Sequence, residues 1–110
     1  MPEQRRQRRY DLRRRLWCEG DRYTVALQTV NASEGGVQLR TSIPPPPGTK
    51  LRISLDEPGR GRVVIDAEVV WAQAGRGRGA MGLRFVQFCE GRDVWTGLLH
   101  ELDGAPKTAE

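Results

Sequence analysis

A long β-strand is predicted at residues 63–71, which read Val-Val-Ile-Asp-Ala-Glu-Val-Val-Trp. Apolar side chains occupy every second position from Val63 to Trp71, whereas Asp66 and Glu68 fall on alternate positions. This period of two is typical of a strand with one face against a core and the other in solvent. We therefore expect Trp71 to share the inner face of the strand with Val63.

Shorter segments with the same period lie on both sides of this strand. Each is bounded by glycine, proline or asparagine, which favour turns. The segment 43–48, Ile-Pro-Pro-Pro-Pro-Gly, must be a loop because proline cannot donate to a β-ladder. The further strands are expected at residues 12–18, 23–29, 37–41, 51–56 and 81–85.

The period changes from strand to helix near the C-terminus. Gly104 and Pro106 are expected to end this helix, and residues 105–110 to form a frayed tail. Several short strands followed by one helix predict an all-β fold, a small antiparallel barrel whose opening is covered by the helix. The apolar side chains at the spacing of one helical face are Val94, Trp95, Leu98, Leu99 and Leu102.

The composition favours a single globular domain and argues against an enzyme. The chain has 110 residues, and no apolar run approaches the roughly 20 residues of a membrane helix. No apolar region follows the basic N-terminus, so a secretory signal is not expected and the cytoplasm is the expected location. Cys18 and Cys89 have no metal-ligand spacing and are expected to be free thiols. With His100 as the single histidine, no catalytic set can be assembled.

Positive charge is concentrated in an arginine-rich arm, residues 1–11, which contains Arg5-Arg6-Gln7-Arg8-Arg9. The net charge is +4, but residues 1–15 carry +5 and the remainder carries −1. Arginine presents a planar fork of donors that fits a phosphate or the edge of guanine. The arm has no apolar periodicity, so we expect it to be flexible until an anionic partner holds it.

The segment 31–36, Asn-Ala-Ser-Glu-Gly-Gly, lies between two expected strands. Asn31 offers two donors and an acceptor, Ser33 offers a hydroxyl, and Gly36 allows a ligand to approach the backbone. These residue types also form ordinary turns, so a turn without a ligand is the alternative. Beside the arginine-rich arm, the segment suggests a site for a small anionic ligand with hydrogen-bonding edges, such as a nucleotide.

A second glycine pattern has a structural explanation. Residues 77–82, Gly-Arg-Gly-Ala-Met-Gly, match the dinucleotide pattern GxGxxG. That pattern requires a helix directly after it, whereas residues 83–86 continue as a strand. We therefore expect these glycines to form a hairpin turn and to allow close backbone approach.

The chain resembles the PilZ domain, a family of bacterial cyclic di-GMP receptors. The resemblance rests on Arg5-xxx-Arg9 and Asn31-x-Ser33-x-x-Gly36, followed by residues 43–49 and by Val69-Val70-Trp71. It covers nearly the whole chain and implies a six-stranded antiparallel β-barrel with a C-terminal helix over residues 12–104. The implied ligand-binding residues are Arg5, Arg6, Arg9, Asn31, Ser33 and Gly36, with Arg8 and Gly35 in a secondary role.

The resemblance implies a receptor whose ligand is cyclic di-GMP, with no other cofactor or metal. Ligand binding would order the arm and signal to an unidentified effector protein in trans. One alternative is a PilZ-like interaction adaptor that does not bind the ligand. Another is a basic-armed barrel that binds nucleic acid, which the near-neutral body disfavours. One bound ligand and a stacked pair both remain open.

The arginine motif has two possible registers, because Arg9-xxx-Arg13 has the same spacing as Arg5-xxx-Arg9. Arg5 and Arg9 are preferred since they precede the strand expected from Leu12. If Arg13 were the second motif arginine, little chain would remain for that strand.

Overall fold

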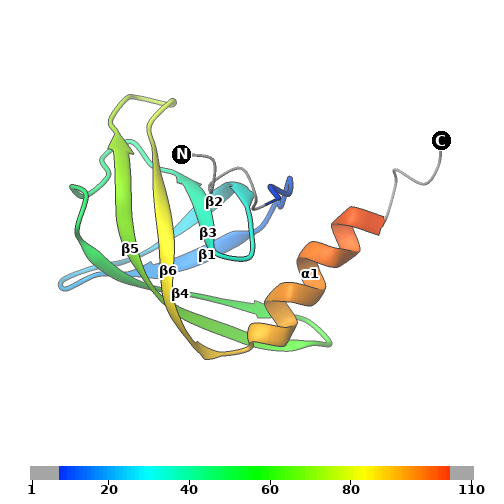
Figure 1. The fold of residues 1–110 in the computed structure, drawn as a ribbon. Helices are drawn as coiled ribbons and strands as arrows, with labels where there is room; N and C mark the ends of the chain where they lie inside the picture. Colours follow the sequence, from blue (N-terminus) through cyan, green and yellow to red (C-terminus); the bar gives the residue numbers. More distant parts are fainter. Residues whose placement is uncertain (1–7, 105–110) are drawn as a thin grey trace.

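The fold is a closed antiparallel β-barrel with one C-terminal helix, as a computed structural model describes it for residues 8–104, with side chains to residue 102 (Figure 1). Around the barrel the strands follow the order β1-β2-β3-β6-β5-β4. The six-stranded barrel and the terminal helix are thus confirmed. The elements are β1 (Arg15–Glu19), β2 (Thr24–Ala32), β3 (Gly36–Arg40), β4 (Lys50–Glu57), β5 (Gly61–Gln73), β6 (Ala80–Glu90) and α1 (Arg92–Gly104).

The barrel closes because β1 pairs with strands on both of its sides. Trp17 of β1 lies opposite Ala26 of β2 and opposite Ser54 of β4. The long strand β5 pairs with β4 through its first part and with β6 along most of its length. Each strand therefore has two hydrogen-bonded neighbours, and none of the six presents an open sheet edge.

The core lies inside the barrel and is completed by α1. Alternate residues of β5 from Val63 to Val69 are buried, as the period of two predicts. The predicted helical face is also buried, since Trp95, Leu98 and Leu99 are each at most 2% exposed. The Trp95 ring packs edge-on against Phe85 of β6, with centroids 5.4 Å apart. The helix therefore supplies part of the core.

The first strand begins at Arg15, three residues later than expected. Leu12 is nonetheless buried in the core. Hydrogen bonds to the buried Thr29 side chain hold the segment before β1 against β2. The Thr29 hydroxyl donates to the Leu12 carbonyl and accepts a 2.9 Å hydrogen bond from the Arg14 amide. Arg14 therefore precedes the strand, and its guanidinium pairs with Glu57 at 3.1 Å. The expected strand start at Leu12 is therefore wrong, and the start of β1 gives no reason to prefer Arg5-xxx-Arg9 over Arg9-xxx-Arg13.

The expectation that Trp71 faces the core is also wrong. The register with β6 shifts between the pairs Val69↔Leu83 and Trp71↔Gly82, which marks a β-bulge. Val70 is the extra residue of the bulge, and its insertion turns Trp71 to the outer surface, where the side chain is 39% exposed. Gly82 provides the space, since a Cβ at that position would collide with the indole.

The glycines of the β5–β6 hairpin have the structural role that the sequence suggested. Gly77 has a φ of +68°, which glycine adopts without strain. A Cβ on Gly79 would collide with the carbonyl oxygen of Thr41.

Cys18 and Cys89 are both free thiols, and burial raises the pKa of Cys18 to about 11. Within residues 8–104, no helix has the length and apolarity needed to cross a membrane.

Candidate ligand-binding site

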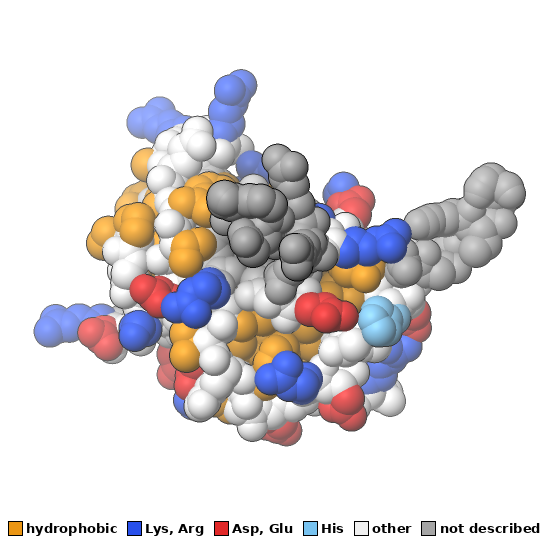
Figure 2. Space-filling view, viewed as in Figure 1, with side chains coloured by type: hydrophobic (Ala, Val, Ile, Leu, Met, Phe, Trp, Pro, Cys, Tyr) orange, Lys and Arg blue, Asp and Glu red, His pale blue; other side chains and the backbone are white. Residues whose placement is uncertain are grey.

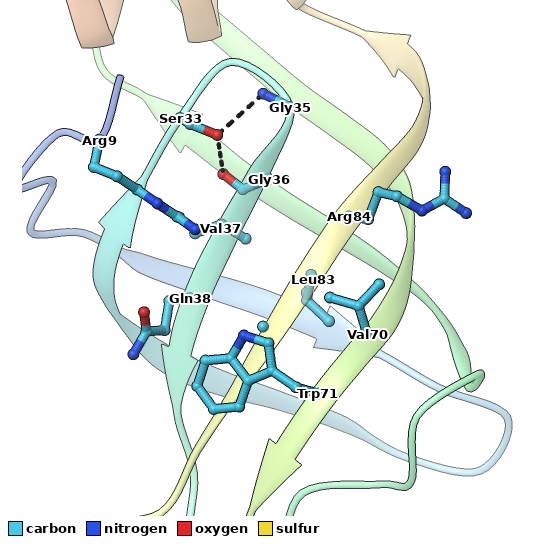
Figure 3. Close-up of a pocket in the computed structure, with 11 residues that line it drawn as sticks. Arg9, Ser33, Gly35, Gly36, Val37, Gln38, Val70, Trp71, Leu83 and Arg84 are labelled. Carbon is cyan, nitrogen blue, oxygen red and sulfur yellow. Dashed lines mark hydrogen bonds between the residues drawn. The ribbon is translucent and has the colours of Figure 1, made fainter. Parts of the chain in front are cut away.

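A pocket of about 430 Å³ lies on the outer surface of β3 and β6, between the end of the arm and the bulge of β5 (Figure 3). Its volume is within the usual range for small-molecule sites. Two of the described lining residues are arginines and none is acidic, so the pocket favours an anion. The lining residues are Arg9, Ser33, Gly35, Gly36, Val37, Gln38, Val70, Trp71, Gly82, Leu83 and Arg84.

Arg9 is brought to this pocket by the residue that follows it. Tyr10 forms an antiparallel bridge with Ala32 at the end of β2, with N–H···O distances of 2.7 and 2.9 Å. The Arg9 Nη1 then donates a 2.9 Å hydrogen bond to the Asn31 Oδ1. The Asn31 Nδ2 in turn donates to the Gln38 Oε1 at 3.0 Å. Asn31 therefore orients Arg9 without neutralising its charge.

The turn between β2 and β3 is closed by Ser33, which is only 2% exposed. Its backbone N–H donates to the Gly36 carbonyl at 2.9 Å, and its hydroxyl accepts a 3.2 Å hydrogen bond from the Gly35 amide. Figure 3 shows the hydroxyl between Gly35 and Gly36. Hydroxyl-to-backbone bonds of this kind fix a turn without help from a ligand. The buried hydroxyl thus gives the pocket rim a defined shape.

Gly36 lies in β3 at a close contact with the backbone of β6. A Cβ at this position would be 2.5 Å from the backbone carbonyl oxygen of Leu83. The missing side chain therefore permits the pairing of β3 with β6, in addition to exposing backbone to the pocket. The structure adds this packing requirement to the ligand approach that the sequence suggested for Gly36.

The opposite wall of the pocket comes from the bulge of β5 and from β6. The five-membered ring of Trp71 covers Gly82. Val70, the residue before Trp71, also lines the pocket. Arg84 of β6 adds a second cation, and its Nη2 lies 2.6 Å from the Glu68 Oε1. Arg84 is therefore paired with a carboxylate, whereas within residues 8–104 the Arg9 guanidinium has no ion-pair partner.

Sequence reasoning missed this wall as part of a binding site. Gln38 occupies a polar position of an alternating strand, which does not distinguish it from any solvent-facing residue. The outward turn of Val70 and Trp71 depends on the bulge, which the apolar pattern conceals. The sequence signals for this wall were Val69-Val70-Trp71, which the resemblance included without a ligand role, and Gly82, whose lack of a side chain leaves room for the indole.

Four of the eight predicted ligand residues line the pocket: Arg9, Ser33, Gly35 and Gly36. Asn31 lies behind Arg9 and holds it, as described above. Arg8 is not a lining residue, and its guanidinium lies 5.7 Å from the centre of the Tyr10 ring. Arg5 and Arg6 lie outside the described residues.

The alternative register also has a position in the structure. Arg13 is not a lining residue, and its Nε lies 3.1 Å from the Asp11 Oδ1. Both groups of this pair are exposed. Arg9 is common to the two possible motifs, so the pocket supports its role in either register. Arg13 lies outside the pocket lining, and the choice between the two registers stays a prediction.

The family model of the PilZ domain matches residues 3–93 of the chain. No curated protein sequence matches the chain significantly. The PilZ domain of YcgR from Escherichia coli, solved with c-di-GMP, aligns with a TM-score of 0.69 and 17% identity over 94% of this chain and 95% of that one. The PilZ domain of CeSA from a cellulose-synthesizing bacterium aligns with a TM-score of 0.64 and 20% identity over 87% and 98% of the two chains.

A longer protein shows the same fold. The motility inhibitor MotI/DgrA of Bacillus subtilis aligns with a TM-score of 0.68 and 16% identity over 91% of this chain. The aligned part is only 52% of that protein, so this chain spans about half of its length. At these identities the likeness shows a shared barrel-and-helix fold.

Proposed function

Because this chain belongs to the PilZ domain family, we propose that it is a non-enzymatic receptor for cyclic di-GMP. The observation that carries the proposal is the position of Arg9, which Asn31 holds at a pocket with no acidic lining residue. Cyclic di-GMP has two phosphodiesters and two guanines. An arginine can pair bidentately with a phosphate or with O6 and N7 of guanine. The solved YcgR domain with c-di-GMP, which has the same fold, supports this assignment.

The proposed site uses two elements of the chain. Arg5 and Arg9 clamp a phosphate or guanine, while Arg6 and Arg8 add positive charge. Ser33, Gly35 and Gly36 form the barrel side of the site, and Asn31 orients Arg9. All of the ligand residues expected from the sequence are therefore proposed to bind the ligand or to orient a binding residue: Arg5, Arg6, Arg8, Arg9, Asn31, Ser33, Gly35 and Gly36.

Trp71 adds a surface for a base. An exposed indole beside a cationic group is a suitable platform for a purine, because any base can stack its π-face on the ring. Gly82 leaves room for the ring, because a Cβ at that position would collide with the indole. We therefore include Trp71 in the proposed site, with Gln38 as a polar group at its edge.

Signalling is the part of the proposal that depends most on the arm. We propose that the ligand orders residues 2–9 of the arm against the barrel and that an effector protein recognises the result in trans. Support comes from the charge of this segment, which two phosphates would partly neutralise. The Tyr10 bridge gives the arm a fixed point next to the pocket.

Titration calorimetry with cyclic di-GMP tests the receptor function directly. Folded chain at near-physiological salt is expected to bind cyclic di-GMP in preference to GTP, GMP and cyclic AMP. Absence of binding by folded protein would favour the adaptor that has lost the ligand.

The salt dependence separates the receptor from a nucleic-acid-binding protein. Binding of an oligonucleotide releases counterions in proportion to the phosphates neutralised, so its affinity falls steeply with salt. A ligand with two phosphates is expected to show a much shallower slope. Tighter binding of single-stranded DNA or RNA than of cyclic di-GMP at about 0.15 M salt would replace the receptor by the nucleic-acid-binding barrel.

A further inference from the structure

Large apolar side chains are exposed beside the ligand pocket. Ile43 is 86% exposed, Val70 47% and Trp71 39%, and we call these three residues the apolar ledge. Figure 2 shows apolar side chains gathered over the region where Figure 1 places β5 and the β3–β4 loop. Exposed apolar groups that gather in one place mark an interaction surface more often than scattered ones do.

The β3–β4 loop is fixed along the end of β5, which holds the ledge together. The Gly48 amide donates to the Val69 carbonyl at 2.7 Å, and the Gly75 amide donates to the Ser42 carbonyl at 3.2 Å. Between these two points the loop contains four consecutive prolines, residues 44–47. Proline also restricts the backbone of the residue before it, so Pro44 limits Ile43 to extended conformations. A surface that is already ordered loses little entropy on binding.

The two segments that form the ledge carry charge of one sign, and Glu68, two residues before Val70, is paired with Arg84. The segments 38–49 and 70–82 contain Arg40, Arg76 and Arg78 and no aspartate or glutamate. We call these three residues the arginine rim. All three are exposed, and no ion pair joins them to another residue within 8–104. The rim therefore offers uncompensated positive charge next to an apolar surface.

We propose that the apolar ledge and the arginine rim form a docking surface for an acidic segment of a partner protein. The segment would carry a large apolar side chain that covers Ile43, with aspartate or glutamate beside it. Aromatic residues and arginine are enriched at protein interfaces, and complementary charge selects the partner. Three arginines are fewer than the roughly four to eight basic residues of a typical anionic-lipid site. The signalling role of this surface rests on the proposed function, because Val70 and Trp71 of the ledge also line the ligand pocket.

Selection from a displayed library of short random peptides on the immobilised full chain tests this surface. The selected peptides are expected to combine acidic residues with a large apolar residue. Synthetic copies should bind about tenfold more weakly to Ile43→Asp and to the double variant Arg76→Glu/Arg78→Glu, because each removes a central contact or reverses the charge.

Two variants elsewhere on the surface serve as matched controls. Trp17 is 54% exposed on β1, two strands away from β5 in the closed barrel, and Arg22 is exposed in the β1–β2 turn. Trp17→Asp and Arg22→Glu are expected to bind the same peptides as the unmodified chain does. Selected peptides that lack acidic residues, or that bind Ile43→Asp undiminished, would overturn the proposal. So would tighter Ile43-dependent binding to phosphatidylserine vesicles or to a single-stranded oligonucleotide.

A cyclic di-GMP titration of Ile43→Asp separates this surface from the receptor function. Ile43 does not line the pocket, so this variant should bind the nucleotide normally. If the peptides follow the expected pattern and cyclic di-GMP binds neither chain, the docking surface stands and the receptor function fails. If cyclic di-GMP binds and no acidic peptide depends on Ile43, the docking surface alone is wrong.

Discussion

The indole Nε1 of Trp95 donates a 3.0 Å hydrogen bond to the backbone carbonyl of Ser33. This bond joins the buried face of α1 to the turn that forms one rim of the pocket. A second contact lies nearby, where the His100 Nε2 is 3.5 Å from the Glu34 Oε2. The helix therefore does more than cover the core, since it also holds the β2–β3 turn in position.

Trp95→Phe is expected to weaken both the fold and the site. The variant keeps an aromatic ring against Phe85 but leaves the Ser33 carbonyl without its indole donor. An unsatisfied buried acceptor costs about 1–3 kcal/mol, which urea unfolding can measure. We expect the loosened turn to reduce cyclic di-GMP affinity by roughly fivefold, or about 1 kcal/mol.

A core variant away from the turn separates stability from affinity. Ile65 is fully buried in β5, and Ile65→Val is expected to cost about 0.5–1.5 kcal/mol through the lost methylene. Its affinity for cyclic di-GMP should not change. If it lost affinity as much as Trp95→Phe, the effect would come from general destabilisation and not from the turn.

The arginine register can be decided by single alanine substitutions. A bidentate arginine–guanine pair contributes roughly 1–3 kcal/mol, so Arg9→Ala and Arg5→Ala are each expected to weaken binding about 5- to 150-fold. Arg13→Ala should have little effect, because that guanidinium pairs with Asp11 in solvent. Arg22→Ala is the control for loss of one positive charge. A large loss for Arg13 with none for Arg5 would establish the other register.

Most of the barrel could be predicted from alternation, whereas local departures from it could not. The inner face from Val63 to Val69 follows the period of two closely. The bulge before Trp71 arises from pairing with another strand, so no window of residues around it shows the change. The start of β1 depends on the Thr29 side chain, which is 15 residues away from Arg14 in sequence. Tertiary hydrogen bonds of this kind have no signature in local periodicity.

The same limit applies to the candidate site. Arg9 and Ser33 could be identified because their motif spacing is local. The link from Arg9 through Asn31 to Gln38 required the antiparallel pairing of β2 with β3. The wall at Trp71 required the bulge as well, so one side of the pocket was predictable and the other was not.

Trp71 is expected to contribute to the affinity for cyclic di-GMP. Stacking of a base on an aromatic ring is worth about 1–3 kcal/mol, so Trp71→Ala should weaken cyclic di-GMP binding by 5-fold or more. Trp71→Phe should retain part of this affinity. Urea unfolding of the same chains measures the stability lost with the ring, because the indole also packs on Gly82. Equal binding by the tryptophan and alanine chains would remove Trp71 from the proposed site.

Two glycine-to-alanine substitutions should have opposite effects on stability. Gly36→Ala is expected to destabilise the barrel by about 1–3 kcal/mol, because the new methyl would collide with the Leu83 carbonyl. Gly97→Ala in α1 should stabilise the chain by about 0.5–1 kcal/mol, because alanine loses less backbone entropy than glycine in a helix. The new Cβ has room, since its nearest atom would be the Arg60 Nη1 at 3.6 Å. Urea unfolding measures both. A stable Gly36→Ala chain would contradict the close approach of β3 and β6.

The ordering of the arm by cyclic di-GMP is tested by amide hydrogen exchange with and without the nucleotide. Fixing each residue costs about 1–2 kcal/mol of backbone entropy, and the seven arginines of residues 1–15 repel one another. We therefore expect fast exchange from Glu3 to Arg9 in the free chain. Two phosphates offset part of the repulsion and give the arginines a common partner, so these amides should become protected on binding.

The structure supplies internal references for this measurement. The Tyr10 amide already donates to the Ala32 carbonyl, so it should be protected in both states. The amides of β5 should change little, because their barrel pairing does not involve the ligand. Slow exchange from Glu3 to Arg9 without nucleotide would exclude the switch while leaving binding intact. Protection that appears on binding in the unmodified chain but not in Arg9→Ala would show that the pocket arginine couples the ligand to the arm.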